Sequence, residues 1–221
     1  MSSSPSVSAV IPTLDEERFI SLCLDSLLVQ TVKPCEIIVV DGGSKDRTVE
    51  LARRYTDKIL VSPVANIALQ RELGVRQASG EYILLVDADT VLPPDTIRLM
   101  LEDFTDPTVA AVTVDIAPLN PNPITMINCW ARNLATPWLT QRGCCFMFRR
   151  SMVERDALFS VDGYVSKLDI IPLRRRLKGR IVKDSRVTVL TDIPVEQQIQ
   201  TAALIGLAAA GAVLLYLYLR S

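Results

Sequence analysis

The sequence of 221 residues contains no histidine, which removes the side chain that most often serves as general base, metal ligand or pH switch near neutrality. Neither sign of charge is in excess, since 24 basic residues stand against 25 acidic ones, and the balance gives no support to nucleic-acid binding. The five cysteines include no CxxC pair, which predicts reduced, buried thiols and argues against a disulfide framework or a zinc site.

The two ends of the chain differ in character. Residues 1–6 lack the basic and apolar regions of a signal peptide, and we expect them to be disordered. Near the other end, Thr201–Leu219 carries no charge over 19 residues. As a helix it would cover about 28 Å, close to the ~30 Å hydrocarbon thickness of a bilayer. We therefore predict one transmembrane anchor over residues 199–220; the alternative is a buried core helix.

Basic residues predict the orientation of this anchor, because Lys and Arg next to a span are kept preferentially in the cytoplasm. Four precede it and only Arg220 follows it; the four are Lys178, Arg180, Lys183 and Arg186. The protein is thus expected to be a single-pass membrane protein with its large domain, residues 7–195, in the cytoplasm. Small residues at Ala202, Gly206 and Ala210 would allow two spans to pack, so a homodimer is possible.

Strand-type and helix-type segments alternate through the first half of the chain, which predicts an α/β fold with a mostly parallel sheet and helices on both faces. The expected strands are Val7–Ile11, Glu36–Val40, Lys58–Val61, Tyr82–Val86, Cys145–Phe148 and Val187–Leu190. The expected helices are Glu16–Gln30, Arg47–Tyr55, Asn66–Ala78 and one that opens at Pro93-Pro94. After Val114 the pattern weakens. An apolar stripe of Ile127, Trp130, Leu134 and Trp138 fits either a helix in a membrane interface or an ordinary core face.

The most informative motif is the apolar strand Tyr82–Val86, which runs directly into Asp87-Ala88-Asp89. Ligands of open α/β sheets bind beside the carboxyl ends of the strands, where these two carboxylates are expected. Oxygen ligands there suit a divalent cation, Mg²⁺ or Mn²⁺, that bridges to a phosphate or diphosphate. The alternative is that the pair only caps a turn.

A second strand end carries Asp41, followed by Gly42 and Gly43. The carboxylate is placed to accept a hydrogen bond from a ring N–H, and the glycines let the backbone approach a flat ligand closely; a tight turn without a ligand is the alternative. Arg71 is expected on the helix before the metal strand, either near the donor phosphates or on a solvated face.

Three segments together resemble family 2 glycosyltransferases of the GT-A fold, over about Val7 to Val189. They are SAVIPTLDEE, VVDGGSKDRT and GEYILLVDADT, and they occur in the family's order and spacing. The resemblance implies a donor site for a nucleotide-diphosphate sugar, with Asp89 as the chief metal ligand and Asp87 contacting ribose or metal. The residues it places around the donor are Pro12, Thr13, Glu16, Asp41, Gly43, Arg71 and Asp87.

The second half departs from the family's pattern. The counterpart of the family's Glu-Asp pair is Leu168-Asp169, which leaves Asp169 as the candidate general base for an acceptor hydroxyl, with a helix N-cap as the alternative. A lipid-phosphate acceptor, already ionised, would need no strong base, and the chain also resembles synthases of polyprenyl-phosphate sugars. Arg174-Arg175-Arg176 would bind phosphate or anionic headgroups.

The sequence therefore predicts a membrane-anchored, inverting, metal-dependent transferase of the hexosyltransferase type, with a lipid-linked or saccharide acceptor. Two alternatives remain open. The missing Glu also fits a nucleotide-sugar-binding or assembly protein without turnover. The segment ILLVDADTV meets the loose pattern of a haloacid-dehalogenase-type phosphatase, in which the first Asp is a nucleophile.

Overall fold

The computed structural model describes residues 5–135, 144–152 and 177–203. Its elements in chain order are β1 (Val7–Thr13), α1 (Ile20–Leu28), β2 (Glu36–Asp41), α2 (Thr48–Ala52), β3 (Ile59–Val61), α3 (Ile67–Gln77), β4 (Tyr82–Val86), β5 (Thr90–Val91), α4 (Thr96–Asp103), β6 (Val109–Pro118), α5 (Pro123–Ala135), β7 (Cys145–Arg149), the 3₁₀ turn η1 (Arg150–Met152) and β8 (Arg180–Thr191). Residues 195–203 form a further helix after β8.

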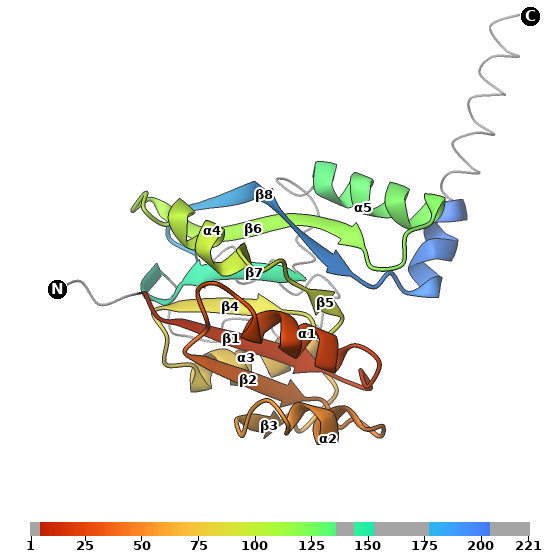
Figure 1. Cartoon of the computed structure of the whole chain (residues 1–221), viewed down its shortest axis with the longest axis horizontal. Coiled ribbons are helices and arrows are strands. Elements are labelled where there is room, and N and C mark those ends of the chain that lie inside the picture. Colours follow the sequence, from red (N-terminus) through yellow and green to blue (C-terminus); the bar gives the residue numbers. More distant parts are fainter. Residues whose placement is uncertain (1–4, 136–143, 153–176, 204–221) are drawn as a thin grey trace, which may run out of the picture.

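The strands of the described residues form one sheet in the order β3-β2-β1-β4-β7-β6-β8-β5 (Figure 1). Strands β3, β2, β1 and β4 are all parallel, as the alternation of strands and helices predicted. Beyond β4 the sheet becomes mixed, because β7 enters antiparallel to both of its neighbours. Four of the seven described pairings are parallel, so the expected parallel character belongs mainly to the first half.

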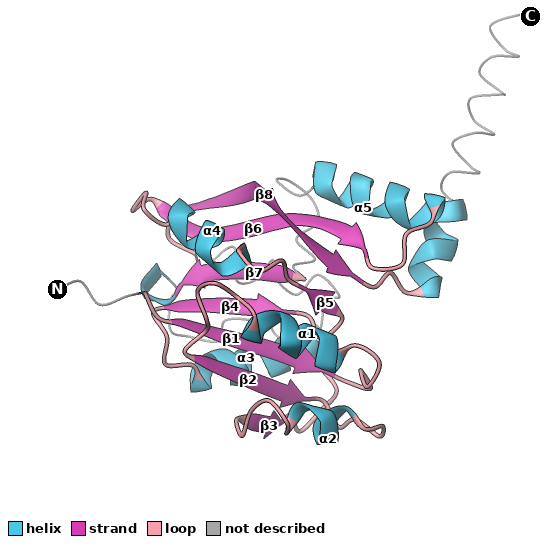
Figure 2. Cartoon of the chain, viewed as in Figure 1, coloured by secondary structure: helices cyan, strands magenta, loops and turns pink. Residues whose placement is uncertain are grey.

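Helices cover both faces of the parallel half, and the side chains of its strands alternate between two apolar cores (Figure 2). In β4, for example, Leu84 packs toward the core beneath α1 and α4, whereas Ile83 and Leu85 pack toward the core beneath α3. A strand buried on both faces needs a continuous apolar run. The sequence Tyr82–Val86 meets that need, and its predicted bounds are confirmed.

Helix α3 sits close to the sheet and leads into β4. Asn66 caps it as expected, with its side-chain oxygen accepting from the Leu69 N–H at 3.1 Å. Gly74 makes the close approach possible, since a Cβ there would lie 2.2 Å from Cγ1 of Val10 in β1. This packing fixes the position of the preceding turn of α3, which carries Gln70 and Arg71, against the strand ends.

The expected helix Glu16–Gln30 is shorter in the structure, because its first turn is replaced by a loop. Asp15 has a positive φ of 54°, and the Glu16 N–H donates to Oγ1 of Thr48 at 2.7 Å. These contacts tie the loop after β1 to the loop after β2, so that α1 begins only at Ile20. The long strand β6 was not expected, and β8 begins seven residues before the expected Val187.

Within the described residues, none of the helices has the length and apolar character needed to cross a membrane. The predicted span Thr201–Leu219 lies outside them except for its first three residues. The transmembrane anchor therefore stays a prediction.

Candidate functional site

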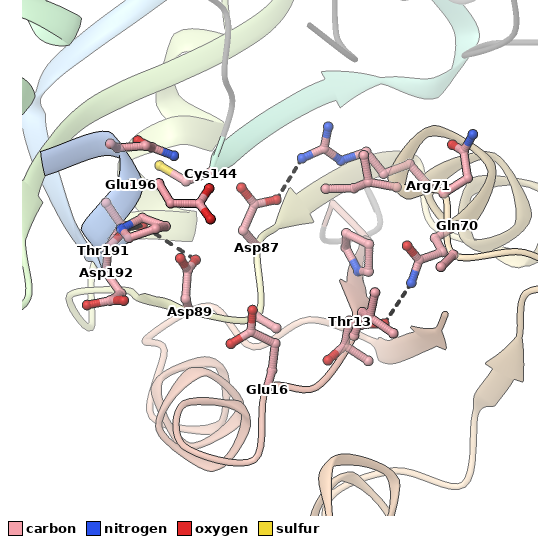
Figure 3. Close-up of a pocket in the computed structure, with 18 of the residues that line it drawn as sticks. Thr13, Glu16, Gln70, Arg71, Asp87, Asp89, Cys144, Thr191, Asp192 and Glu196 are labelled. Carbon is pink, nitrogen blue, oxygen red and sulfur yellow. Dashed lines mark hydrogen bonds and ion pairs between the residues drawn. The ribbon is translucent and has the colours of Figure 1, made fainter. Parts of the chain in front are cut away.

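A cleft of about 560 Å³ opens where β1 and β4 end, a volume within the usual range of small-molecule sites (Figure 3). Residues from both halves of the chain line it. From the first half come Pro12, Thr13, Leu14, Glu16, Ala65, Asn66, Ile67, Gln70, Arg71, Asp87, Ala88 and Asp89; from the second half come Arg132, Cys144, Thr191, Asp192, Pro194, Glu196, Gln197 and Gln200. Six of the predicted site residues thus meet here: Pro12, Thr13, Glu16, Arg71, Asp87 and Asp89.

Asp87 is held by a buried arginine. Nη2 of Arg71 donates to Oδ1 of Asp87 at 2.6 Å, and the Arg71 side chain is only 4% exposed whereas that of Asp87 is 30% exposed. The backbone of Asp87 is held as well, because its N–H donates to the Cys144 carbonyl at 2.9 Å. Of the two readings of Arg71, the solvated helix face is therefore wrong: the guanidinium lies in the cleft and orients a carboxylate.

Asp89 lies in a less favourable environment. Burial raises its pKa to about 7, and the neighbouring carboxylates of Asp87 and Asp192 add to the rise. Two hydroxyl groups donate to Oδ1 at long distance, Thr90 at 3.3 Å and Thr191 at 3.4 Å. Burial is only partly offset by these contacts, so the charged form of this carboxylate is costly without a further cationic partner.

Glu16 faces the same space as the two aspartates (Figure 3). Burial raises its pKa to about 7, with further contributions from Asp89, Asp87 and Asp192. The backbone of Glu16 is fixed by the bond to Thr48, so the carboxylate is delivered to the cleft by a restrained loop. Several acidic side chains are thus gathered in one partly desolvated place, which is a common property of functional sites.

Two thiols lie close to the aspartates: Cys144 lines the cleft, and Cys23 is fully buried beneath it. Burial raises the pKa of Cys144 to about 12, and that of Cys23 is raised for the same reason. Sγ of Cys23 lies 3.6 Å from the backbone oxygen of Asp87. Both thiols are therefore neutral at physiological pH and serve as small apolar groups. The prediction of buried cysteines is confirmed for four of the five and is wrong for Cys35, which is exposed.

Gln70 joins the ends of the first two strands. Its Nε2 donates to the Thr13 carbonyl at 2.7 Å and to the Val40 carbonyl at 2.8 Å. Close by, the buried hydroxyl Oγ1 of Thr13 has no hydrogen-bond partner in the described part of the chain. A buried polar atom left without a partner at a cleft wall is the kind of group that a ligand satisfies.

Asp41 and Gly43 do not line the cleft. The Asp41 side chain is buried and accepts hydrogen bonds from the Gly43 N–H at 2.9 Å and from the Ser44 N–H at 3.1 Å. Gly43 has a φ of +95°, a conformation that favours glycine. In this structure both residues build the turn after β2, which was the alternative reading for the glycines.

The candidate base Asp169 and the cluster Arg174-Arg175-Arg176 lie outside the described residues. The residues that sequence reasoning missed come from the second half, notably Asp192 and Glu196. Asp192 follows β8 just as Asp87 follows β4, so the rule of the carboxylate after a strand could have found it. Glu196 belongs to the helix after β8, and no motif marks it.

The donor set fits a divalent cation. Asp87 and Asp89 are hard oxygen ligands, and their mutual repulsion with Glu16 would be relieved by positive charge. No group of three His, Cys, Asp or Glu side chains arranged to enclose a metal occurs among the described residues. The pair Asp87 and Asp89 suits Mg²⁺ or Mn²⁺ carried with a diphosphate, because such ions commonly use one or two carboxylates and take their other ligands from phosphates and water.

The fold and the cleft define an α/β protein with an acidic ligand site at its strand ends, and the comparisons with known proteins specify the family. Residues 8–156 match glycosyl transferase family 2, and the chain belongs to that family. It is 34% identical over 124 residues to a chondroitin synthase of Pasteurella multocida, an alignment that spans 53% of this chain and 13% of that protein. The chain thus corresponds to a small part of the length of that relative.

Solved structures confirm the GT-A-like fold. The mannosyltransferase PcManGT of Pyrobaculum calidifontis, in complex with GDP-Man and Mn²⁺, has a TM-score of 0.68 at 24% identity, covering 88% of this chain and 59% of that one. Glucosyl-3-phosphoglycerate synthase of Mycobacterium tuberculosis, in complex with Mn²⁺, UDP-Glc and phosphoglyceric acid, has a TM-score of 0.64 at 19% identity, covering 91% and 78%. The match to glycosyl transferase family 2 confirms the expected family, and the haloacid-dehalogenase alternative has no support among the relatives described above.

Proposed function

We propose that the protein transfers a sugar from a nucleotide-diphosphate sugar to an acceptor, with inversion at the anomeric carbon and with Mg²⁺ or Mn²⁺. The observation that carries this proposal is the meeting of Asp87, Asp89 and Glu16 in a cleft of about 560 Å³ at the end of β4, in a member of glycosyl transferase family 2.

The donor would occupy the cleft beside the loop after β1. Pro12 and the unpartnered hydroxyl of Thr13 would contact the nucleoside, and Asp41 would accept from a base N–H if the turn after β2 opened to it. Support for this class of donor comes from the related folds, one in complex with GDP-Man and Mn²⁺ and another with UDP-Glc and Mn²⁺.

The residues around the aspartates have distinct tasks. Asp89, with Asp87, would hold the cation, which when bound would neutralise charge developing on the departing diphosphate. Arg71 keeps Asp87 in place through the bond of 2.6 Å. The neutral thiols of Cys23 and Cys144 exclude water beneath the site, which strengthens electrostatic interactions within it.

The acceptor would attack from the face of the sugar opposite the diphosphate, which gives inversion. Asp169 would take the proton of an acceptor hydroxyl, whereas a polyprenyl phosphate would attack as the ion it already is. We place the acceptor on a lipid, because the uncharged run Thr201–Leu219 begins in the helix that lines the cleft. We place the domain on the cytoplasmic side of a single-pass anchor, because the basic residues beside that run are mostly on the domain's side of it.

A thermal-shift screen tests the donor. The full chain, purified in detergent, is heated with UDP-, GDP- and dTDP-sugars, each with and without Mn²⁺; a ligand that binds the native state raises the melting temperature. We expect one nucleotide to do so only with Mn²⁺. No shift with any of them would contradict the proposal, and a shift without transfer to any acceptor would favour the non-catalytic alternative.

Radiolabelled transfer tests the acceptor. We expect transfer from the donor found above to a polyprenyl phosphate, and little to soluble saccharides. Asp169→Asn separates the two chemistries, since it should abolish transfer to a hydroxyl but leave transfer to a lipid phosphate largely intact. Equal activity of wild type on soluble acceptors without detergent would contradict the lipid-linked acceptor.

A further inference from the structure

Helix α5 exposes an apolar face, whereas a surface helix in a water-soluble domain exposes a polar one; its other face buries Thr125 and Cys129. Trp130 is 65% exposed and Leu134 is 68% exposed. Met126 and Ile127 are exposed on the same side, at helical spacing from Trp130. We call these four residues the apolar surface of α5. The core-face reading of the stripe is thus wrong for its described members, and Trp138 lies outside the described residues.

The opposite side of α5 is tied to the domain by polar contacts. Asn133 bonds both backbone groups of Ile116 in β6: Oδ1 accepts from the N–H at 2.9 Å and Nδ2 donates to the carbonyl at 2.8 Å. Nζ of Lys183 in β8 donates to the Asn133 carbonyl at 3.0 Å. These bonds fix the rotation of the helix about its axis, so the exposure of Trp130 and Leu134 is built into the fold.

The helix of residues 195–203 lies beside α5 (Figure 1). Nδ2 of Asn128 donates to Oγ1 of Thr201 at 2.7 Å, and Nδ2 of Asn122 lies 3.3 Å from Oε1 of Gln198. This second helix also exposes apolar side chains, Val195 and Ile199. Six exposed apolar residues therefore lie on two helices that are hydrogen-bonded to each other, and they include the most exposed ones of α5, Trp130 and Leu134.

The sequence that continues from residue 203 indicates what covers this surface. It adds sixteen uncharged residues, 204–219, before Arg220. If this run enters a bilayer, the helix from which it continues must stand at the membrane surface, and α5 stands there with it. Tryptophan favours the headgroup region, and α5 contains no acidic residue that anionic lipids would repel.

We propose that α5 lies in the interface of the membrane, with Met126, Ile127, Trp130 and Leu134 in the boundary between headgroups and acyl chains. Such helices bury their apolar face by about 5–10 Å. This inference rests on the membrane anchoring in the proposed function. It has a consequence for catalysis, because Arg132 of the same helix lines the cleft. The cleft then opens at the bilayer surface, where a lipid-linked acceptor can reach it without leaving the membrane.

Fluorescence of Trp130 tests the proposal directly. The chain has two tryptophans, so Trp138→Phe leaves Trp130 as the sole reporter. The full-length variant is reconstituted in vesicles of phosphatidylcholine and phosphatidylglycerol, with lipids brominated either near the headgroup or deep in the acyl chain. We expect blue-shifted emission, resistance to iodide, and stronger quenching by the shallow bromines than by the deep ones.

The matched control moves the reporter to α1, away from α5. Leu22 there is 48% exposed, and a chain with Leu22→Trp, Trp130→Phe and Trp138→Phe should be quenched by iodide and not by brominated lipid. If Trp130 behaves like this control in chains that float with the vesicles, the proposal is wrong while the anchoring holds. Blue-shifted emission without bromine quenching would mean that Trp130 is covered by protein, either the chain's own C-terminus or a second copy. That result would also overturn the proposal. Chains that fail to float would overturn the anchoring and the proposal together.

A second measurement links the surface to catalysis. Ile127→Ser, Trp130→Ser and Leu134→Ser are combined; because these side chains are exposed, the domain should remain folded. We expect kcat/KM for polyprenyl phosphate in vesicles to fall at least tenfold, with the donor-induced thermal shift unchanged. The control pair Leu22→Ser and Leu28→Ser, whose side chains are 48% and 43% exposed on α1, should leave both quantities unchanged. Equal activity of the triple variant and this control would contradict the proposal.

Discussion

Two carboxylates at opposite ends of the parallel strands show how differently one chemical group is used. Glu36 stands at the amino end of β2, and burial would raise its pKa, but hydrogen bonds from Lys58, Ser8 and Ser79 lower it to about 2. Asp89 stands beyond the carboxyl end of β4, and burial with neighbouring carboxylates raises its pKa to about 7. One carboxylate has protein partners for its charge, and the other meets like charges.

The difference separates a carboxylate that stabilises the fold from a carboxylate that is suited to bind a ligand. Oε1 of Glu36 accepts from the Ser79 N–H and hydroxyl, each at 2.7 Å, and so fastens the end of α3 to the edge of β2. Asp89 receives only two long hydroxyl contacts. The Asp89 carboxylate would gain a cationic partner only when the proposed cation and diphosphate bind. Its stabilisation would then belong to the bound state.

The largest expected effect is on catalysis, from replacing Asp89 by its amide. We expect Asp89→Asn to lower kcat by about 10²–10³-fold or more, because a charged group opposite the developing charge is lost. The melting temperature without metal should stay the same or rise at pH 8, since an unfavourable buried charge is removed. Radiolabelled transfer and calorimetry measure the two. Full activity of this variant would remove Asp89 from the mechanism.

The matching amide substitution at the amino end of the strands, Glu36→Gln, should lower stability and leave catalysis unchanged. Glu36→Gln removes the charge that pairs with Lys58 and weakens the bonds from Ser8 and Ser79. We expect the free energy of unfolding to fall by about 1.5–3 kcal/mol, the usual range for hydrogen bonds to charged groups. Urea denaturation measures this, and kcat should be unchanged because Glu36 lies away from the cleft. A loss of activity without a loss of stability would contradict the division of roles.

The carboxylates at the two ends of the strands should also make the stability of the metal-free protein depend on pH in opposite directions. Glu16 and Asp89 ionise near 4.5 and 3.8 when unfolded but near 7 when folded, so the native state holds more protons between these values and their contribution falls as pH rises to about 7. Glu36 titrates near 4.5 unfolded and near 2 folded, so its contribution is lost as pH falls through that range.

Thermal unfolding in chelator across pH 2–9 tests this comparison. Asp89→Asn should flatten the decline above about pH 4.5, and Glu36→Gln should flatten the decline below it. Adding Mn²⁺ at pH 7–8 should stabilise wild type and leave Asp89→Asn nearly unaffected. If Mn²⁺ raised the melting temperature of both equally, the cation would bind elsewhere.

The two halves of the chain also differ in how readily the sequence predicts the residues that they contribute to the cleft. The strand Tyr82–Val86 and the aspartates after it are adjacent in the chain, so local pattern alone placed them correctly. Asp192 follows an expected strand, but its place beside Asp89 depends on the pairing of β8 with β5, in which Thr191 lies opposite Thr90, 101 residues earlier in the chain. No local signal carries such a pairing.

The missed strand β6 has an equally specific cause. Its first residue, Val109, is followed by two small alanines, Ala110 and Ala111, which do not mark a strand although both are buried. The contact of Asp41 with a ligand stays a prediction. In the structure its carboxylate accepts from the turn that Gly43 makes possible, and residue types alone do not predict that arrangement.

The smallest expected effect on stability comes from removing Lys58, the residue that forms an ion pair with Glu36. Lys58 lies close to Oε2 of Glu36, but its side chain is 51% exposed, and exposed ion pairs contribute about 0–1 kcal/mol. Lys58→Met should therefore cost less than Glu36→Gln, because the bonds from Ser8 and Ser79 remain. Urea denaturation at low and high salt measures both variants, and only the wild type should lose stability as salt screens the pair. If Lys58→Met cost as much as Glu36→Gln, the ion pair rather than the buried hydrogen bonds would hold this end of the sheet.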